Sequence, residues 1–548
     1  MTNNNRAGTK NRGTGTWRVA AGVLVALLLA GAATAQVTGL YYQEVAKDGR
    51  IYVFNTSERY KSFQTSGEMG TGITLIGRGA NGETVVAENE TALDLFLFKH
   101  NLPGYDRPTP KAPSPNDSAP LQFKIGNASI TPLGFMDFTG MWRSTDVGSG
   151  IGTNFGSIPY GKTYQDNLSE TRFSMQNSRI GFRIDSDVKS THVMAYMEGD
   201  FLGNNGGNVA VSSNSNTFRS RLFFVDLKNG DTELSMGQTW SLITPGRSGI
   251  STLPGDVFFT QDIDVNYQAG LVWARVPELR FVYHPSKQAA FAIALDSPEQ
   301  YVGGSAGGGL VTFPAALSNY PGGQLDNGST TLGVPNRMPD VIAKVAFDPS
   351  SSVHVEFGGL YREFEVYNTN TSRNYSANGT GEFLNFNVEL FRGFRLVANG
   401  YLSDGGGRYI FGQAPDLIAR ADGSLSPVKS RSSVSGFEYT NGGTLLYAYY
   451  GGVTVDRNVA LDTNGKYVGY GYAGAPTGQN HTIQEETLGF TQTFWKDPKY
   501  GALALMGQVS HLSRAPWSVA SGQPSNAQLN MVYLNVRYLF PGAAPASK

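Results

Sequence analysis

The sequence predicts an all-β protein, a transmembrane antiparallel β-barrel of about sixteen strands that follows a small N-terminal β-rich module. Three observations support this fold class. Segments of roughly ten residues alternate between apolar and polar side chains, and the connections between the segments alternate between short and long. The composition combines 16% charged residues with 68 glycines and 12% aromatic residues, which is typical of an all-β chain with many turns rather than of a helical enzyme.

The alternation is clearest in four segments, 172–185, 191–201, 218–228 and 232–240. Apolar side chains occupy the even positions of the first segment near Phe182, and polar ones occupy the odd positions. A period of two indicates a strand, because successive side chains of a strand point to opposite faces. A tight turn, a longer Gly/Asn/Ser run and a second tight turn connect the segments, which is the pattern of a transmembrane barrel.

Charge and cysteine content narrow the classes of function. The chain has 548 residues and a formal net charge of −1, so no global field favours nucleic acid as a partner. It has no cysteine, which excludes thiol catalysis, disulfides and thiolate metal sites. The same absence fits an oxidising compartment such as the periplasm.

Residues 1–35 are predicted to be a cleaved signal peptide. Basic residues precede an apolar run from Val19 to Ala30, and Ala33 and Ala35 offer a small-x-small cleavage site. The alternative is a membrane anchor, for which the apolar run is short. No later stretch is apolar and long enough to predict a transmembrane helix.

Two further segments are predicted before the barrel. Residues 36–101 are expected to form a periplasmic β-rich module, with strand-like runs at 51–55, 73–77 and 93–98. This module lacks heptads, which argues against a coiled-coil stalk. Residues 102–120 carry prolines among Ser, Lys, Asp and Asn, a composition that indicates an extended linker.

The barrel itself is predicted at 121–540, with a tail at 541–548. The expected strands are 131–143, 172–185, 191–201, 218–228, 232–241, 271–284, 288–296, 339–348, 352–364, 382–391, 394–402, 433–440, 444–454, 482–495, 500–511 and 527–540. Short connections such as 229–231 contain Asn-Gly turn chemistry, whereas the connections that alternate with them are longer and rich in Gly, Asn, Ser and Pro. The alternatives are a barrel of about fourteen or eighteen strands, a propeller and a parallel β-helix, of which the last two do not predict alternating loop lengths.

Three short motifs lie in the best-patterned region: Glu-Gly-Asp-Phe at 198–201, Arg-Ser-Arg at 219–221 and Gly-Gln-Thr-Trp-Ser at 237–241. Together with the signal peptide they resemble the DcaP-like and related trimeric porins of Gram-negative bacteria. The resemblance implies a homotrimeric outer-membrane channel that takes small, often anionic, solutes. The N-terminal module departs from these porins, which resemble coiled coils there, so the resemblance assigns it no role.

Charged residues in the middle of strands are predicted to line the pore. In a barrel of this size the outward face meets lipid and the inward face meets water, and a charge in hydrocarbon is costly. The predicted pore-lining residues are Arg179, Arg183, Arg219, Arg221, Arg280, Lys344 and Glu356. Because the arginine fork binds carboxylates through two parallel hydrogen bonds, we expect a preference for anionic or carboxylate-bearing solutes. The alternative is that these arginines only balance wall acids and keep the wall rigid.

The third long loop, 242–270, is predicted to fold into the barrel as a constriction. It carries Asp256, Asp262 and Asp264, which would create a transverse field opposite a basic wall. The alternative is an external flap, since long loops are often mobile.

Signals for catalysis are weak. The six His residues are scattered without metal-ligand spacing, and a Gly-x-Ser-x-Gly motif is absent. The sequence therefore predicts a porin, not an enzyme, that contacts outer-membrane lipid, needs no cofactor or metal and lets small hydrophilic solutes diffuse passively. A plugged barrel with a structural or adhesive role is the alternative.

Overall fold

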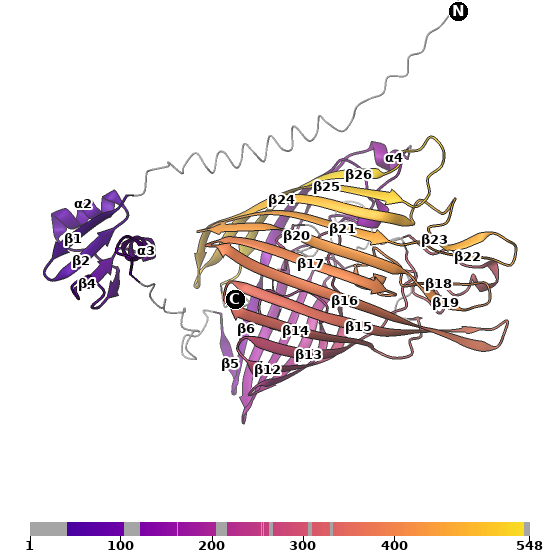
Figure 1. Cartoon of the computed structure of the whole chain (residues 1–548), viewed down its shortest axis with the longest axis horizontal. Helices are drawn as coiled ribbons and strands as arrows, with labels where there is room; N and C mark the ends of the chain where they lie inside the picture. Colours follow the sequence, from indigo (N-terminus) through magenta and orange to yellow (C-terminus); the bar gives the residue numbers. More distant parts are fainter. Residues whose placement is uncertain are drawn as a thin grey trace, which may run out of the picture. The chain divides into compact units, whose positions relative to one another are not determined.

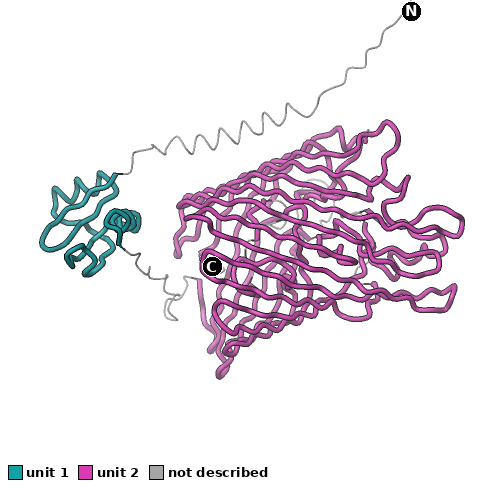
Figure 2. The backbone as a smooth tube through the Cα atoms, in the orientation of Figure 1, with its two compact units in different colours: residues 1–117 teal, residues 118–548 magenta. Residues whose placement is uncertain are grey.

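The chain forms two compact units, residues 1–117 and 118–548 (Figure 2). The structure, a computed structural model, describes residues 41–102, 121–161, 163–203, 216–253, 255, 257–261, 267–304, 309–328 and 333–541. The predicted signal peptide lies outside the described residues, as do the linker beyond Leu102 and the tail beyond Pro541.

The first unit contains a four-stranded sheet with the strand order β1-β2-β4-β3 and two helices. Its elements are β1 (Gln43–Lys47), β2 (Arg50–Phe54), α2 (Ser57–Ser66), β3 (Ile73–Leu75), β4 (Thr84–Ala87) and α3 (Glu90–Lys99). Strands β2 and β4 are parallel. Phe96 of α3 packs against Val53 of β2 and Val85 of β4, and all three side chains are fully buried. The predicted small N-terminal sheet is therefore confirmed.

The predicted strand at 93–98 is wrong, because these residues belong to helix α3. The side chain of Asn89 accepts a hydrogen bond from the backbone N–H of Ala92 at 2.9 Å and caps the first turn. Glu90 in the first turn and Lys99 in the last turn also favour the helix through its dipole.

The second unit is a closed antiparallel barrel with sixteen strand positions (Figure 1). Its strands are β6 (Ala128–Arg143), β7 (Glu170–Ser174), β8 (Arg179–Val188), β9 (Thr191–Asp200), β10 (Arg219–Asn229), β11 (Thr232–Trp240), β12 (Arg275–Ser286), β13 (Ala289–Asp296), β14 (Asp340–Ser350), β15 (Val353–Asn368), β16 (Arg373–Phe391), β17 (Phe394–Asp404), β20 (Lys429–Asn441), β21 (Thr444–Val455), β24 (Asn480–Asp497), β25 (Gly501–Pro516) and β26 (Ala527–Leu539). The last strand closes the barrel by pairing with the first, with Val532 opposite Trp142. The predicted antiparallel barrel is confirmed.

Strands β7 and β8 share one position in the barrel. Strand β7 pairs with the end of β6, at Gly140 opposite Phe173, and β8 pairs with its beginning, at Leu133 opposite Gly181. The predicted strand 172–185 is therefore interrupted. The residues between the predicted strands 352–364 and 382–391 also differ from expectation, since β15 and β16 extend through them to a tight turn.

The connections contain additional short elements. These are β5 (Phe123–Ile125), α4 (Tyr164–Asn167), β18 (Leu417–Ala419), β19 (Leu425–Pro427), β22 (Asn458–Leu461), β23 (Tyr467–Tyr470) and three 3-10 turns, η1 (Phe155–Ser157), η3 (Ala315–Leu317) and η5 (Gly407–Tyr409). Strand β5 pairs with the start of β6, whereas the pairs β18–β19 and β22–β23 form small sheets of their own. In Figure 1 these two pairs lie at one end of the barrel and the short turns at the other.

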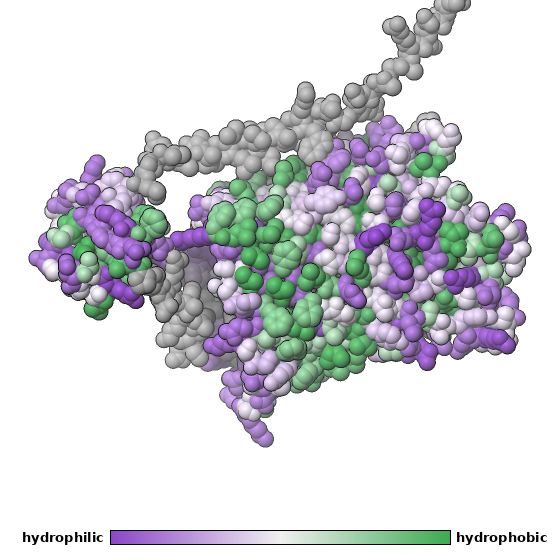
Figure 3. Space-filling model, in the orientation of Figure 1, coloured by the Kyte–Doolittle hydropathy of each residue, from purple (hydrophilic) through white to green (hydrophobic). Residues whose placement is uncertain are grey.

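Alternation along the strands gives the barrel an apolar outer band and a densely packed interior. Outward side chains such as Phe281, Leu384 and Phe437 are exposed, and Figure 3 shows green residues gathered on the half of the barrel nearer the short turns. Inward side chains such as Ile342 and Val434 are buried together with residues of the long connections. An apolar outer band of this kind is what a membrane-spanning barrel presents to lipid.

Candidate functional site

The described parts of the connection between β11 and β12, residues 241–274, lie inside the barrel. The backbone N–H of Gly246 donates to Glu356 of β15 at 2.9 Å, and that of Gly249 donates to Asp348 of β14 at 2.8 Å. The amide of Asn385 on β16 donates to the carbonyl of Gly246 at 3.0 Å. Because Glu356 and Asn385 are buried on the inward side of their strands, the first half of the loop lies on the inner wall.

The second half of the loop continues along the wall to β24 and β25. The backbone N–H of Gln261 donates to Gln508 of β25 at 2.5 Å, and that of Ala269 donates to Glu485 of β24 at 2.8 Å. Contacts from β14 to β25 thus hold the described parts of the loop against a large arc of the barrel.

Gly270 allows the loop to approach the wall closely. Its φ is +86°, and a Cβ atom there would lie 2.6 Å from the backbone oxygens of both Ser433 and Gly452. Only glycine fits this combination of left-handed backbone and contact with neighbouring strands.

Two of the predicted pore-lining residues anchor the loop. Lys344 and Glu356 form an ion pair of 3.3 Å, and Nζ of Lys344 donates to the carbonyl of Thr244 at 2.7 Å. His354 lies 3.3 Å from the same carboxylate. Lys344 and Glu356 are almost completely buried beneath the loop, so these two charges hold the loop in place rather than face open solvent.

Arg280 and Arg221 are buried as well. Arg280 pairs with Glu278 at 2.6 Å and donates to the carbonyls of Trp240 and Ser251 at the start of the loop. Arg221 pairs with Glu198 at 2.9 Å. The guanidinium of Arg280 therefore links β12 to β11 and to the loop, and that of Arg221 links β10 to β9.

Three predicted arginines remain partly exposed on the wall formed by β8, β9 and β10. Arg183 has 33% of its side chain exposed and pairs with Asp185 at 2.8 Å. Arg219 has 29% exposed and pairs with Asp200 at 2.6 Å. Arg179 has 12% exposed and lies 3.7 Å from Glu198. All seven predicted charges are thus ion-paired, as the rigid-wall alternative requires, while Arg183 and Arg219 also reach solvent.

A β-bulge changes the expected facing of β10. The register shifts between Ser220 and Leu222, so Arg221, Leu222 and Phe224 are all buried inside. Leu222 and Phe224, which alternation alone would place on the outer face, instead form an apolar cluster with Tyr196.

The three predicted acids of the constriction loop, Asp256, Asp262 and Asp264, lie outside the described residues.

The sequence patterns do not predict all of the residues that hold the loop in place. Arg247 on the loop forms two hydrogen bonds with Glu438 of β20, at 2.6 and 2.8 Å. The signal for Glu438 was present, since it alternates with the outward Phe437 and Tyr439. Arg247 stands in a loop without periodicity, so no pattern pointed to it.

Buried ion pairs also join the long connections to the strands. Arg362 of β15 pairs with Asp416 at 2.8 Å and with Asp340 of β14 at 3.2 Å. Asp416 also accepts the backbone N–H groups of Tyr301 and Arg408 at 2.9 and 2.8 Å. Burial acts to lower the pKa of Arg408, but the neighbouring Tyr409, Glu299 and Asp340 raise it above the ordinary value, so Arg408 stays charged. One carboxylate thus holds two separate connections.

Aromatic side chains of the loop pack against those of other inward connections. Phe155 stacks on Tyr267 with ring centres 4.5 Å apart, and Trp273 stacks on Phe411 at the same distance. Trp240 meets the edge of Trp273 at 5.1 Å. These contacts give the inward connections an apolar core of their own.

The described residues contain no group of three or more His, Cys, Asp or Glu placed to hold a metal ion. They also contain no helix that is long and apolar enough to cross a membrane.

Comparison with known proteins identifies the fold. No protein-family model and no curated protein matches the chain. Among known structures, the outer membrane channel DcaP of Acinetobacter baumannii is 17% identical, with a TM-score of 0.55, over 76% of this chain and 99% of its own. OmpF of Salmonella typhi is 10% identical with a TM-score of 0.42, over 76% of this chain and 100% of its own. OprB of Pseudomonas putida is 10% identical with a TM-score of 0.40, over 75% of this chain and 94% of its own. The chain therefore has the fold of the DcaP outer membrane channel, and the predicted resemblance to DcaP-like porins is confirmed at the level of the fold.

Proposed function

We propose that the protein is an outer-membrane porin through which small hydrophilic solutes diffuse passively. The observation that carries this proposal is the loop 241–274, which wall residues such as Glu356 and Glu485 hold inside a closed barrel. A loop fixed at many points narrows a pore without needing to open and close. The apolar outer band supports a location in a membrane.

We extend the proposal to a preference for anionic solutes that carry carboxylates. Arg183 and Arg219 are the predicted arginines that retain the largest solvent exposure on the inner wall. The ion pair of Arg183 with Asp185 uses Nε and Nη2, whereas a guanidinium carries five N–H donors. A passing carboxylate is thus offered further donors from a group that is already positioned.

Three further parts complete the proposal. The barrel assembles as a homotrimer, which the resemblance to trimeric porins supports. The signal peptide 1–35 directs export, and the module 36–101 lies in the periplasm on the linker 102–120; both parts are supported by the sequence pattern alone. Cross-linking of the full chain tests the trimer, and N-terminal sequencing of the mature protein tests cleavage.

Conductance in a planar bilayer tests the channel. Purified, detergent-extracted protein is expected to give stepwise currents, and the reversal potential under a salt gradient is expected to show anion preference. A double variant, Arg183→Ala with Arg219→Ala, is expected to shift that potential towards cations. Arg431→Ala is the control, because Arg431 lies on the outer face of β20 and is half-exposed there. Unchanged selectivity in the double variant would discard the solute preference and keep the pore.

A plugged barrel with a structural or adhesive role is the second candidate. The observation that favours it is the apolar packing of the inward connections, in which Ile243, Phe258 and Val272 are buried with wall residues such as Val453. If the barrel is plugged, the protein is expected to insert into the bilayer without giving a conductance. That result would refute the porin proposal.

A further inference from the structure

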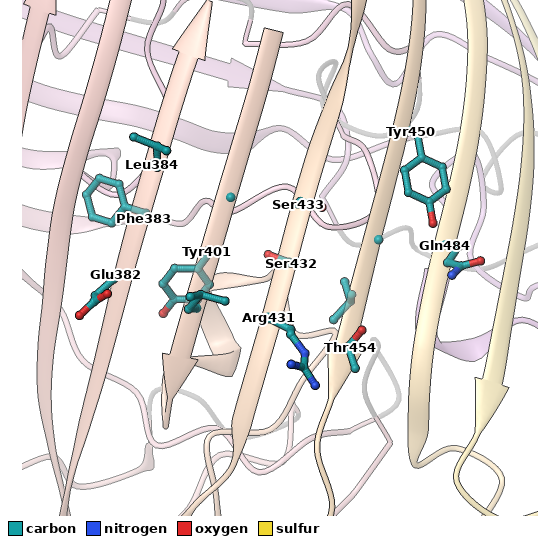
Figure 4. Close-up of a pocket in the computed structure, with 14 residues that line it drawn as sticks. Glu382, Phe383, Leu384, Tyr401, Arg431, Ser432, Ser433, Tyr450, Thr454 and Gln484 are labelled. Atoms are coloured by element: carbon teal, nitrogen blue, oxygen red, sulfur yellow. The ribbon is translucent and has the colours of Figure 1, made fainter.

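The outer face of the barrel carries a groove of about 600 Å³ (Figure 4). It extends over β16, β17, β20, β21 and β24, and most of the side chains that line it lie on the outward side of their strands. A volume of 300–1,000 Å³ is usual for small-molecule sites. The groove lies apart from the inward loop and from the wall arginines described above.

Small residues on adjacent strands make the floor of the groove. Gly400 of β17 is paired with Leu384 on one side and with Ser433 on the other, and Ser433 is paired with Gly452. A Cβ atom at Gly400 would meet nothing within 4 Å, and one at Gly452 would meet only ordinary contacts. The depression is therefore open space that larger residues would fill.

The walls of the groove are apolar and its edge is polar. Leu384, Leu402 and Tyr450 are 50%, 60% and 44% exposed. At the edge, Arg431 is half-exposed and pairs with Asp456 at 2.9 Å, and Glu382 is exposed as well. An apolar trough with polar groups at one end matches an amphiphile.

The position of the groove identifies its occupant. Outward residues nearer the short turns include the apolar Phe437 and Leu488, with Glu486 as a charged exception beside Tyr450. At the opposite edge of the groove lies Arg431, followed by Lys429. The groove thus lies where the apolar band ends. We propose that it holds one hydrocarbon chain of a membrane lipid, with the head of that lipid beside Arg431. The inference rests on the membrane location proposed above.

A second copy of the chain fits the groove less well. A stable protein interface buries about 800 Å² on each partner and packs continuously. Leu384, Leu402 and Tyr450 surround a depression with a floor of small residues, which suits a single hydrocarbon chain more than a flat partner surface.

Photocrosslinking tests the occupant. The full-length protein is reconstituted in vesicles of phosphatidylethanolamine that contain a small fraction of the same lipid with a diazirine in its acyl chain. Crosslinked peptides are expected to include 398–402 and 450–454 about threefold more often than the outward positions of β14, because close packing favours a bound chain modestly over bulk lipid. Gly400→Leu places a larger side chain on the floor, at a position where a Cβ meets nothing within 4 Å, and is expected to remove the excess labelling of the groove. Ala343→Leu, at an exposed outward position of β14, is the matched control and is expected to keep it.

Two results would overturn the proposal. Equal labelling of the groove and β14 would show bulk lipid only, and labelling of the groove below that of β14 would show that a second copy covers it. Labelling of β14 in either case still reports a barrel in lipid, whereas an unlabelled barrel would refute the membrane location itself. This experiment does not measure conductance. A failure of the lipid-groove proposal can therefore be distinguished from a failure of the porin proposal.

Discussion

Arg247 and Glu438 form a two-point ion pair inside the barrel, with hydrogen bonds of 2.8 and 2.6 Å between the loop 241–274 and strand β20. Tyr449 donates to the same carboxylate at 2.8 Å and accepts the backbone N–H of Phe259 at 3.2 Å. The guanidinium also lies over the ring of Phe259, 4.5 Å from its centre. This group of contacts holds the loop beside a strand that is far from it in sequence.

Removing the charge of Glu438 is expected to loosen the loop. In Glu438→Gln one side-chain oxygen becomes an NH₂ group that opposes the Arg247 donors, at a cost on the order of 2 kcal/mol for a mostly buried pair. Single-channel recording is expected to show greater open-channel noise and more frequent changes of level. Glu486→Gln, on the outward side of β24, is the control, and equal noise in the two variants would contradict the anchoring role.

Gly270 gives a second test of how the loop 241–274 is held against the barrel wall. Gly270→Ala places a Cβ against the backbone oxygens of Ser433 and Gly452 and keeps a φ of +86°, for which the backbone strain alone costs about 1–3 kcal/mol. Hydrogen exchange is expected to be faster in residues 267–274 of this variant.

Gly255→Ala is the matched control, because a Cβ there meets nothing within 4 Å. We expect exchange in 267–274 to match the wild type in this control. If Gly270→Ala also exchanges like the wild type, the close approach of the loop to the wall does not stabilise it.

Asp416 is expected to hold two long connections in place. Asp416→Ala removes the partner of Arg362 and the acceptor for the N–H groups of Tyr301 and Arg408. Leaving a buried guanidinium without this carboxylate destabilises by about 3 kcal/mol or more. Limited proteolysis in detergent is expected to cut the connections 297–339 and 405–428 faster, while the strands resist. Asp422→Ala at an exposed turn of the same connection is the control, and similar cutting of both variants would rule out the role of Asp416.

The sequence predicts the barrel well because each strand carries its own local signal. Alternation and turn chemistry depend on neighbouring residues, so the predicted bounds of β10 and β21 lie within one residue of the observed ones. The failure at 93–98 has a different cause. The run Leu-Asp-Leu-Phe-Leu-Phe is a short, largely apolar segment, for which periodicity does not separate a strand from a helix. Asn89 caps a helix at Glu90, and packing on the small sheet favours that helix.

The candidate site is less predictable, since it depends on pairs that are distant in the chain. Alternation placed Arg221, Arg280 and Lys344 on the inner side, but it contains no information on the loop that buries them. The bulge after Ser220 likewise changes the facing of Leu222 through pairing with β9. Whether a wall charge meets solvent or a loop is a property of tertiary packing.

The N-terminal unit allows a test of pH dependence at Glu44. Partial burial acts to raise the pKa of this carboxyl, but hydrogen bonds from Tyr42, His100 and Lys99 outweigh burial and hold the pKa below its ordinary value of 4.5. Because the folded pKa is the lower one, the carboxylate stabilises the unit above pH 4.5, and this contribution disappears as the pH falls through the folded value.

Protection factors of amides in β1 and β2 of the full chain are therefore expected to be lower in Glu44→Gln than in the wild type at pH 7. The difference is expected to shrink towards pH 3. Glu68→Gln, at an exposed position, is the control, and a difference that persists unchanged at low pH would show that shape rather than charge at Glu44 matters.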